Sequence, residues 1–243
     1  ERNREIVVES DSRQIPRGKD NLAYRAAAEY LGKFGIKEGV KIFIEKTIPV
    51  GAGLAGGSTD AAAVISGLNR LYDLGAGMDD LMPIAASLGS DVPFCLLGGT
   101  ALATGRGEIL QPVYPAHALT LVLVKPPFEV STAQVYGQLD LSMIKERPHA
   151  RELLAAWDRN NLEEMAVNMI NVLENVTISR FPEIGQIKNR LLALGASAVL
   201  MSGSGPSVFG LFNNMGKAVS ARDQLRGMYR EVFVVSSYMG SDR

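Results

Sequence analysis

The sequence predicts an α+β protein made of two domains, residues 1–115 and 116–243. Its 243 residues are enough for one large domain or for two of ordinary size. Around residues 114–117 the pattern of apolar residues changes, which indicates a boundary. After it, strand and helix patterns follow in the order β-α-β-β-α-β of a ferredoxin-like domain. Before it, the strand pattern at residues 40–48 alternates apolar and polar side chains, as in a sheet with one solvated face.

Composition excludes several classes of function. The chain carries 25 Lys plus Arg against 26 Asp plus Glu, with no long run of either sign, so neither nucleic acid nor a membrane is expected as a partner. No apolar run approaches the roughly 20 residues of a membrane span. One cysteine, Cys95, fits a reducing cytoplasm. His117 and His149 lack metal-ligand spacing. The oligomeric state is left open, with a homodimer as one option.

The first domain is predicted to contain strand and helix patterns in the order strand, helix, strand, helix, helix, at residues 1–9, 20–31, 40–48, 59–74 and 79–89, followed by a strand and turn at 98–108. Asp20 or Asn21 caps the first helix, and Gly32 ends it. The helix at 59–74 turns one apolar face to the core, Leu71 included. Asp79 and Asp80 are expected as N-caps of the next helix.

A glycine-rich loop, residues 51–59, joins the strand at 40–48 to its helix, and we expect it to bind phosphate. Glycines adopt positive φ and let the backbone approach a ligand closely. The first amides of the following helix have no helical partner, and the helix dipole favours an anion there. Ser58 and Thr59 are good N-caps, and their hydroxyls could hold phosphate oxygens or Mg²⁺.

Two better-known phosphate motifs fit this loop poorly. Gly51, Gly53 and Gly56 satisfy G-x-G-x-x-G, and Asp73 follows at the distance of a dinucleotide fingerprint. The preceding strand alternates, however, whereas strands of a doubly wound parallel sheet read as continuous apolar runs. No Gly-Lys-Ser/Thr closes the loop, so it is not a P-loop.

The second domain is predicted to begin with a strand at residues 120–124. Helical patterns near 132–139, 150–157 and 162–173 form an insertion in the ferredoxin-like plan. The remaining elements are a helix, two strands, a helix and a strand, at residues 182–194, 197–202, 207–212, 217–228 and 231–237. The turn between the two strands, Ser-Gly-Ser-Gly-Pro, is either a tight hairpin or a close neighbour of the phosphate loop.

The glycine-rich loop resembles the second motif of the GHMP kinases, Pro-x-x-x-Gly-Leu-x-Ser-Ser-Ala. Here the motif reads Pro49, Gly53 and Leu54, then an extended Ala-Gly-Gly before Ser58 and Thr59. The likeness continues through nearly the whole chain, in the family's order, at residues 21–27, 89–95, 98–108 and 200–210. The resemblance implies a GHMP kinase fold, with a ribosomal-protein-S5-like N-terminal domain and a ferredoxin-like C-terminal domain.

The same resemblance implies ATP as the phosphoryl donor, with Mg²⁺. Its residue-by-residue transfer assigns the nucleotide site to Asn21, Lys46, Pro49, Gly51, Gly53, Leu54, Gly56, Gly57, Ser58 and Thr59. Asn21 can serve as a helix cap as well as in the nucleotide site. Without the resemblance, Lys46 would be interpreted as a solvated strand residue. The metal ligands stay unassigned.

Asp91 is the candidate catalytic residue. It stands in Gly-Ser-Asp-Val-Pro as one carboxylate among apolar or small neighbours, where a buried carboxylate needs a partner and would most simply cap a helix. The family match instead implies that it takes or directs the proton of the acceptor hydroxyl. Thr132 and Tyr136 match positions that bind the acceptor and stack on its cytosine. The implied acceptor is the tertiary 2-hydroxyl of CDP-methylerythritol, in non-mevalonate isoprenoid biosynthesis.

One family motif has no counterpart in this sequence: the first strand, Lys-Ile-Asn-Leu, and the Asp-Gly-Tyr-His loop after it. The chain begins with Glu1 inside a strand pattern and is expected to lack its true beginning. That motif supplies a lysine partner of the catalytic aspartate, so catalysis is expected to suffer without it. The alternatives are another small-molecule GHMP kinase, a non-catalytic nucleotide-binding remnant and, on G-x-G-x-x-G alone, a dinucleotide oxidoreductase.

Overall fold

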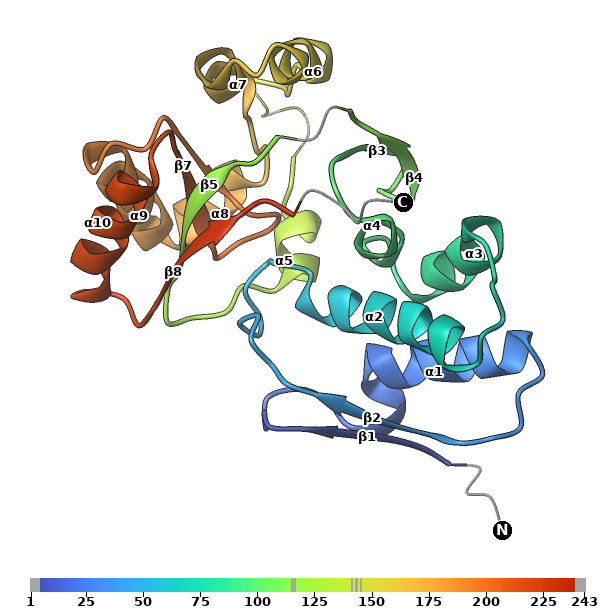
Figure 1. The fold of residues 1–243 in the computed structure, drawn as a ribbon. Helices are drawn as coiled ribbons and strands as arrows, with labels where there is room; N and C mark the ends of the chain where they lie inside the picture. Colours follow the sequence, from blue (N-terminus) through green and yellow to red (C-terminus); the bar gives the residue numbers. More distant parts are fainter. Residues whose placement is uncertain (1–4, 115–116, 141, 143, 145, 239–243) are drawn as a thin grey trace. The chain divides into compact units, whose positions relative to one another are not determined.

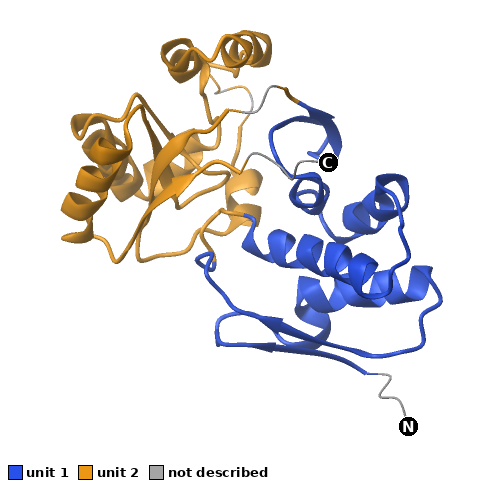
Figure 2. Cartoon of the chain, in the orientation of Figure 1, with its two compact units in different colours: residues 1–50, 55–112, 240–243 blue, residues 51–54, 113–239 orange. Residues whose placement is uncertain are grey.

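The computed structural model describes residues 5–114, 117–140, 142, 144 and 146–238 (Figure 1). Its chain divides into two compact units (Figure 2). The first contains the described residues up to 50 and residues 55–112; the second contains residues 51–54 and the described residues from 113 to 238. The predicted boundary between residues 115 and 116 falls outside the described residues and stays a prediction.

A two-stranded parallel sheet opens the first unit. Strands β1 (Ile6–Ser10) and β2 (Val40–Ile44) pair from Ile6 beside Val40 to Ser10 beside Ile44. Phe43 is 63% exposed while Ile44 is buried, so the predicted solvated face is confirmed. A 3₁₀ turn, η1 (Gly18–Asp20), and helix α1 (Leu22–Lys33) connect the two strands. Residues 1–4 of the predicted first strand lie outside the described residues.

Helices build the rest of the first unit. Helix α2 (Gly56–Leu71) packs against α1, and α3 (Met78–Leu88) and α4 (Val92–Leu97) follow. A hairpin of β3 (Ala101–Thr104) and β4 (Ile109–Pro112) confirms the predicted strand and turn near residue 105. Small side chains let α1 and α2 approach closely, and the core they share includes Ala26, Ala27, Tyr30, Ala61 and Ile65.

Several predicted helix ends in this unit were wrong. Helix α1 continues through Gly32, and Gly35, with φ +65°, follows its end. Helix α3 is capped by Gly77, so Asp79 and Asp80 lie in its first turn, where the dipole still favours negative charge. Leu71, expected in the core, is 66% exposed because it is the last residue of α2.

A four-stranded antiparallel sheet forms the centre of the second unit. Its strands are β5 (Thr120–Lys125), β6 (Ala198–Met201), β7 (Val208–Phe212) and β8 (Glu231–Ser236), in the order β6-β7-β5-β8. Helices α9 (Pro182–Ala193) and α10 (Met215–Arg226) pack against it. Val122, Ile184, Ile187 and Leu225 are fully buried in the core they share. This arrangement confirms the predicted ferredoxin-like domain.

Within the described residues between β5 and α9, the insertion holds the α-helices α5 (Thr132–Gly137), α6 (Ala150–Asp158), α7 (Leu162–Asn168) and α8 (Glu174–Arg180). The helix predicted over 162–173 ends at Asn168, and α8 was not predicted. Trp157 and Met165 are buried in a cluster of their own, which we call the tryptophan cluster; it also contains Ala156, Val113, Leu119, Leu153 and Leu162. Every helix in the described part of the chain is too short or too polar to cross a lipid bilayer.

Candidate active site

The first half of the glycine-rich loop, residues 51–54, lies against the turn at residues 202–206 of the same unit. Ser202 Oγ donates a 2.9 Å hydrogen bond to the carbonyl of Gly53, and the Ser207 amide donates at 3.3 Å to the carbonyl of Ala52. Gly53 has φ +70°, and a Cβ there would lie 2.5 Å from the Gly205 carbonyl oxygen. Glycine is therefore required by both conformation and space. The structure records no hydrogen bond from the amides of residues 51–54 within its described part.

The second half of the loop opens α2 in the first unit. Ala55, with φ 51°, is the N-cap and provides no side-chain cap. The Thr59 amide makes the first helical bond, 2.9 Å to the Ala55 carbonyl. The amides of residues 56–58 precede that bond and have no helical partner. Ser58 and Thr59 therefore lie inside the first turn, and their prediction as N-caps was wrong.

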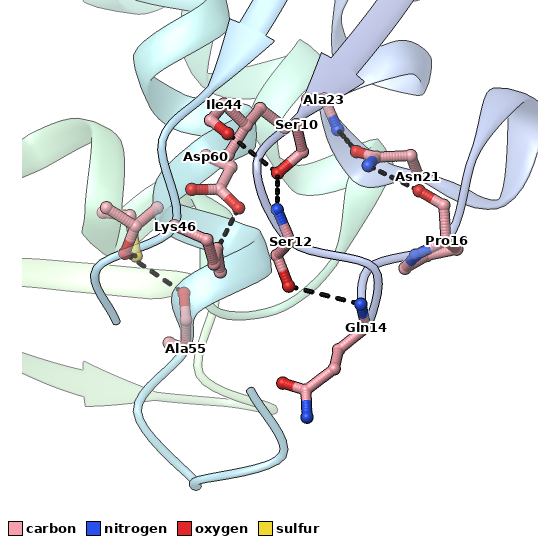
Figure 3. Close-up of polar contacts among 12 residues, drawn as sticks. Ser10, Ser12, Gln14, Pro16, Asn21, Ala23, Ile44, Lys46, Ala55 and Asp60 are labelled. Atoms are coloured by element: carbon pink, nitrogen blue, oxygen red, sulfur yellow. Dashed lines mark hydrogen bonds and ion pairs between the residues drawn. The ribbon is translucent and has the colours of Figure 1, made fainter. Parts of the chain in front are cut away.

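Lys46 lies beside this open helix end. Its Nζ is 2.6 Å from Asp60 Oδ2 on α2 (Figure 3). Both side chains are largely buried, with 6% and 20% exposed. A Cβ built on Gly56 would be 3.1 Å from the same Nζ. The Lys46 amide donates at 2.9 Å to Asp11 Oδ1. The ammonium group of Lys46 is therefore fixed at the start of α2. Lys46 is not the solvated strand residue of the alternative interpretation.

Asn21 is the N-cap of α1, as predicted. Its Oδ1 accepts from the Ala23 amide at 2.8 Å, and its Nδ2 donates to the Pro16 carbonyl at 2.9 Å (Figure 3). The side chain is buried. Pro16 belongs to the segment that lines a pocket of about 160 Å³ behind the end of β1.

Asp91 is exposed, which corrects the expectation of a buried carboxylate. It occupies the N-cap position of α4 but accepts no capping hydrogen bond. One turn later on α4, Cys95 Sγ lies 3.6 Å from the Thr59 hydroxyl. Helix α4 thus holds Asp91 at the end of an element that contacts the first turn of α2.

The pKa of the Cys95 thiol is raised, mainly by burial; the Thr59 hydrogen bond opposes this, and the negative charge of Asp91 adds to it. Because Asp91 disfavours the thiolate, Asp91→Asn should lower the pKa of Cys95. The pH at which iodoacetamide alkylates this single cysteine at half-maximal rate should shift downward in the variant, with mass spectrometry as the readout. Asp79→Asn serves as control, and an equal shift in both variants would contradict the coupling.

Thr132 and Tyr136, predicted to bind the acceptor, both lie on α5. The Thr132 hydroxyl is 2.8 Å from Ser204 Oγ in the 202–206 turn. Tyr136 is 60% exposed and lines an apolar pocket of about 470 Å³, together with Leu139, Asn171 and Phe209. The described residues of the second unit therefore bring both side chains to the neighbourhood of this turn.

Pro49 and Leu54 are half-buried, and Gly51 and Gly57 are exposed. Among the residues that the structure describes, no group of three or more His, Cys, Asp or Glu side chains could hold a metal ion. Sequence reasoning missed Asn171 and Thr177, whose partners at the turn are 27 to 32 residues away in the chain. Ser204 belongs to the predicted Ser-Gly-Ser-Gly-Pro turn, but its contact with Thr132, 72 residues away, was not predicted.

Comparison with known proteins identifies the family. The profile of the GHMP kinases N terminal domain matches residues 21–99, and that of the GHMP kinases C terminal domain matches residues 150–231. The chain belongs to the GHMP kinase family. Two relatives are named 4-diphosphocytidyl-2-C-methyl-D-erythritol kinase: one from Syntrophomonas wolfei, 53% identical over 96% of this chain and 82% of its own length, and one from Alkaliphilus oremlandii, 47% identical over 97% and 81%.

Solved structures agree with the family assignment. A crystal structure of 4-(cytidine 5'-diphospho)-2C-methyl-D-erythritol kinase matches with a TM-score of 0.79 and 36% identity, over 98% of this chain and 84% of that one. Homoserine kinase from Cytophaga hutchinsonii matches with a TM-score of 0.80 at 24% identity, over 97% and 82%, which shows the shared fold. The predicted GHMP kinase fold is confirmed.

Proposed function

We propose that this protein transfers the γ-phosphoryl group of ATP to the 2-hydroxyl of 4-diphosphocytidyl-2-C-methyl-D-erythritol, a step of non-mevalonate isoprenoid biosynthesis. The observation that carries the proposal lies within the first unit. There α4, which begins at Asp91, contacts the first turn of α2 through Cys95 and Thr59. A phosphate on the free amides of α2 would thus lie near an exposed carboxylate. Relatives with that kinase name, about half identical over nearly the whole chain, support the choice of acceptor.

The ATP phosphates are assigned to the glycine-rich loop. Amides of residues 51–54, in the second unit, and of residues 56–58, in the first, have no backbone partner within the described residues, and both groups belong to one continuous stretch of chain. Such amides and a helix N-terminus suit an anion. Lys46 adds a cation at the helix start, partly neutralised by Asp60. Gly51, Gly53, Gly56 and Gly57 add no side chains of their own to the loop, and the side chains of Glu129 and Lys46 lie against Gly51 and Gly56.

We assign the adenosine end to the neighbourhood of Asn21 and Lys46. Asn21 bonds to Pro16, and the Lys46 amide bonds to Asp11, so both residues hold the segment around the 160 Å³ pocket. Its lining of Val8, Ile15 and Pro16 beside Ser10 and Ser12 combines apolar and hydrogen-bonding groups, as a purine base requires.

Asp91 is assigned to the acceptor hydroxyl. Phosphoryl transfer depends on positioning and charge stabilisation more than on covalent help, so Asp91 would act by accepting or directing the hydroxyl proton. Mg²⁺, when bound, would neutralise charge on the phosphate oxygens. The Ser58 hydroxyl accepts no hydrogen bond within the described residues and could serve the metal or a phosphate, whereas Thr59 already donates at 3.1 Å to the Ala55 carbonyl.

The cytidine end of the acceptor is assigned to Thr132 and Tyr136. Tyr136 presents an exposed ring beside an apolar pocket, which suits stacking on a base.

A cytoplasmic location is part of the proposal, supported by the single free cysteine. The balanced charge supports small-molecule partners over nucleic acid or membrane; a homodimer stays a prediction.

The test is a comparison of acceptors with the full-length protein, ATP and Mg²⁺. CDP-methylerythritol should be phosphorylated at a kcat/KM at least about 10³-fold above homoserine or mevalonate, because a site that binds the cytosine leaves polar groups unpaired without it. Phosphorus NMR of the product would identify the modified hydroxyl. Preference for homoserine or mevalonate would favour another GHMP kinase, and ATP binding without any turnover would favour the non-catalytic remnant.

A further inference from the structure

Two side chains outside the family motifs, Asn171 and Thr177, donate hydrogen bonds to the turn at residues 202–206. Asn171, just before α8, donates from Nδ2 to the carbonyls of Met201 at 2.9 Å and Gly203 at 2.7 Å. Its Oδ1 accepts from the Leu173 amide at 3.0 Å. Thr177 on α8 is fully buried, and its hydroxyl donates at 3.2 Å to the Ser204 carbonyl. Together these bonds fix the end of β6, at Met201, and two residues of the turn, Gly203 and Ser204.

The 202–206 turn also fixes the first half of the glycine-rich loop. The carbonyls of Ala52 and Gly53 in the loop accept hydrogen bonds from Ser207, just after the turn, and from Ser202 in the turn. Gly53 packs without room for a Cβ against the carbonyls of Ser202 and Gly205. A shift of the turn would therefore move residues 52 and 53 with it.

We propose that Asn171 and Thr177 are positioning residues for ATP: they hold the 202–206 turn, and the turn holds the amides of residues 51–54 in the conformation that binds phosphate. The inference rests on the proposed function of the loop. Neither side chain would touch the nucleotide. A loop ordered in advance loses less conformational entropy when the ligand binds, so the bracing should appear as ATP affinity.

Thr177→Val and Asn171→Asp test the proposal in the full-length protein. Valine keeps the shape of Thr177 and removes its hydroxyl; aspartate keeps the acceptor for the Leu173 amide and removes both donated bonds. Thr177→Val should weaken ATP binding about three- to tenfold, measured as Kd by calorimetry and as KM, the size expected for one lost hydrogen bond. Asn171→Asp, which loses two bonds, should weaken it by at least as much. For Thr177→Val the kcat at saturating ATP should stay within about twofold. Asn171 also lines the apolar pocket beside Tyr136, so the Asn171→Asp variant is judged by its Kd for ATP alone.

Three control variants separate bracing from general loss of stability. Thr177→Ser restores the hydroxyl and should return the Kd for ATP to within about twofold of the unmodified protein. Ser179→Ala and Asn168→Asp remove bonds of the same kinds that stay inside one helix, Ser179 Oγ to Val176 and Asn168 Nδ2 to Glu164. They should leave the Kd unchanged even if Tm falls.

The outcomes are distinct. If the unmodified protein binds ATP and the Thr177→Val and Asn171→Asp variants bind it equally well, with only a lower Tm, the two residues are structural and the inference is wrong. If kcat of Thr177→Val falls while its KM and Kd for ATP stay constant, the turn acts on the acceptor instead, which also overturns the inference. If the unmodified protein does not bind ATP, the proposed function of the loop itself fails.

Discussion

Asp91→Asn should reduce kcat at least about 10²-fold while the Kd for ATP changes less than about twofold. The amide keeps the size of the side chain but cannot take the acceptor's proton, and a well-placed general base contributes roughly 10² to 10⁴ in rate. ATP affinity should persist because Asp91 lies at the start of α4, whereas the amides assigned to the phosphates belong to residues 51–58. Folding should also persist, since the exposed carboxylate caps nothing.

Rapid-quench measurement of one turnover, together with calorimetric titration of ATP, would separate chemistry from binding in this variant. Asp79→Asn is the matched control, because it removes an exposed carboxylate from the first turn of α3 in the same unit. It should leave kcat within about twofold. Normal turnover in Asp91→Asn would remove Asp91 from the catalytic role, and a large loss of ATP affinity would place it in the nucleotide site instead.

Gly53→Ala should abolish measurable ATP binding, with an increase in Kd of at least about 10²-fold, because φ of +70° is strained for alanine and the new Cβ would meet two carbonyl oxygens, at 2.5 and 2.7 Å. Strain and overpacking should also lower the free energy of unfolding, by about 2–4 kcal/mol. Calorimetry with ATP and urea unfolding would measure the two effects separately.

Gly67→Ala is the control for this variant. Gly67 is helical in α2, and a Cβ there would meet nothing within 4 Å, so alanine should raise the free energy of unfolding by about 0.5–1 kcal/mol and leave ATP affinity unchanged. Normal ATP binding by a folded Gly53→Ala protein would contradict the assignment of phosphate to this loop. Gly57 is a weaker test, since a Cβ there meets only Leu22, at 3.5 Å.

Sequence reasoning predicted those parts of the fold that local patterns determine. Residues close together in the sequence determine the alternation of β2, the Asn21 cap and the order of strands and helices in the second unit. The start of α2 was wrong by three residues because Ala55 adopts the left-handed region, which the chain's local propensities disfavour. Helix α8 was missed because its seven residues are too few to show a clear period.

The residues of the candidate site also divide into those that the sequence could predict and those that it could not. The glycine-rich loop and Asp91 could be selected from sequence because small residues, hydroxyls and one carboxylate stand in short motifs. The ion pair of Lys46 with Asp60 and the bonds of Asn171 and Thr177 could not be, since they depend on how separate elements pack. Residues that support a site from a distance leave no local trace when their partners lie far along the chain.

The tryptophan cluster decides how these binding measurements should be made. Trp157 is the chain's one tryptophan, 8% exposed, and the ring of His117 lies 5.1 Å from its own. Its emission therefore reports the packing of α6 and α7, while the glycine-rich loop contains no aromatic side chain. A nucleotide could occupy that loop without altering tryptophan fluorescence, so a titration without a change in emission would say nothing about affinity. A change in tryptophan emission on heating would mark the melting of this cluster.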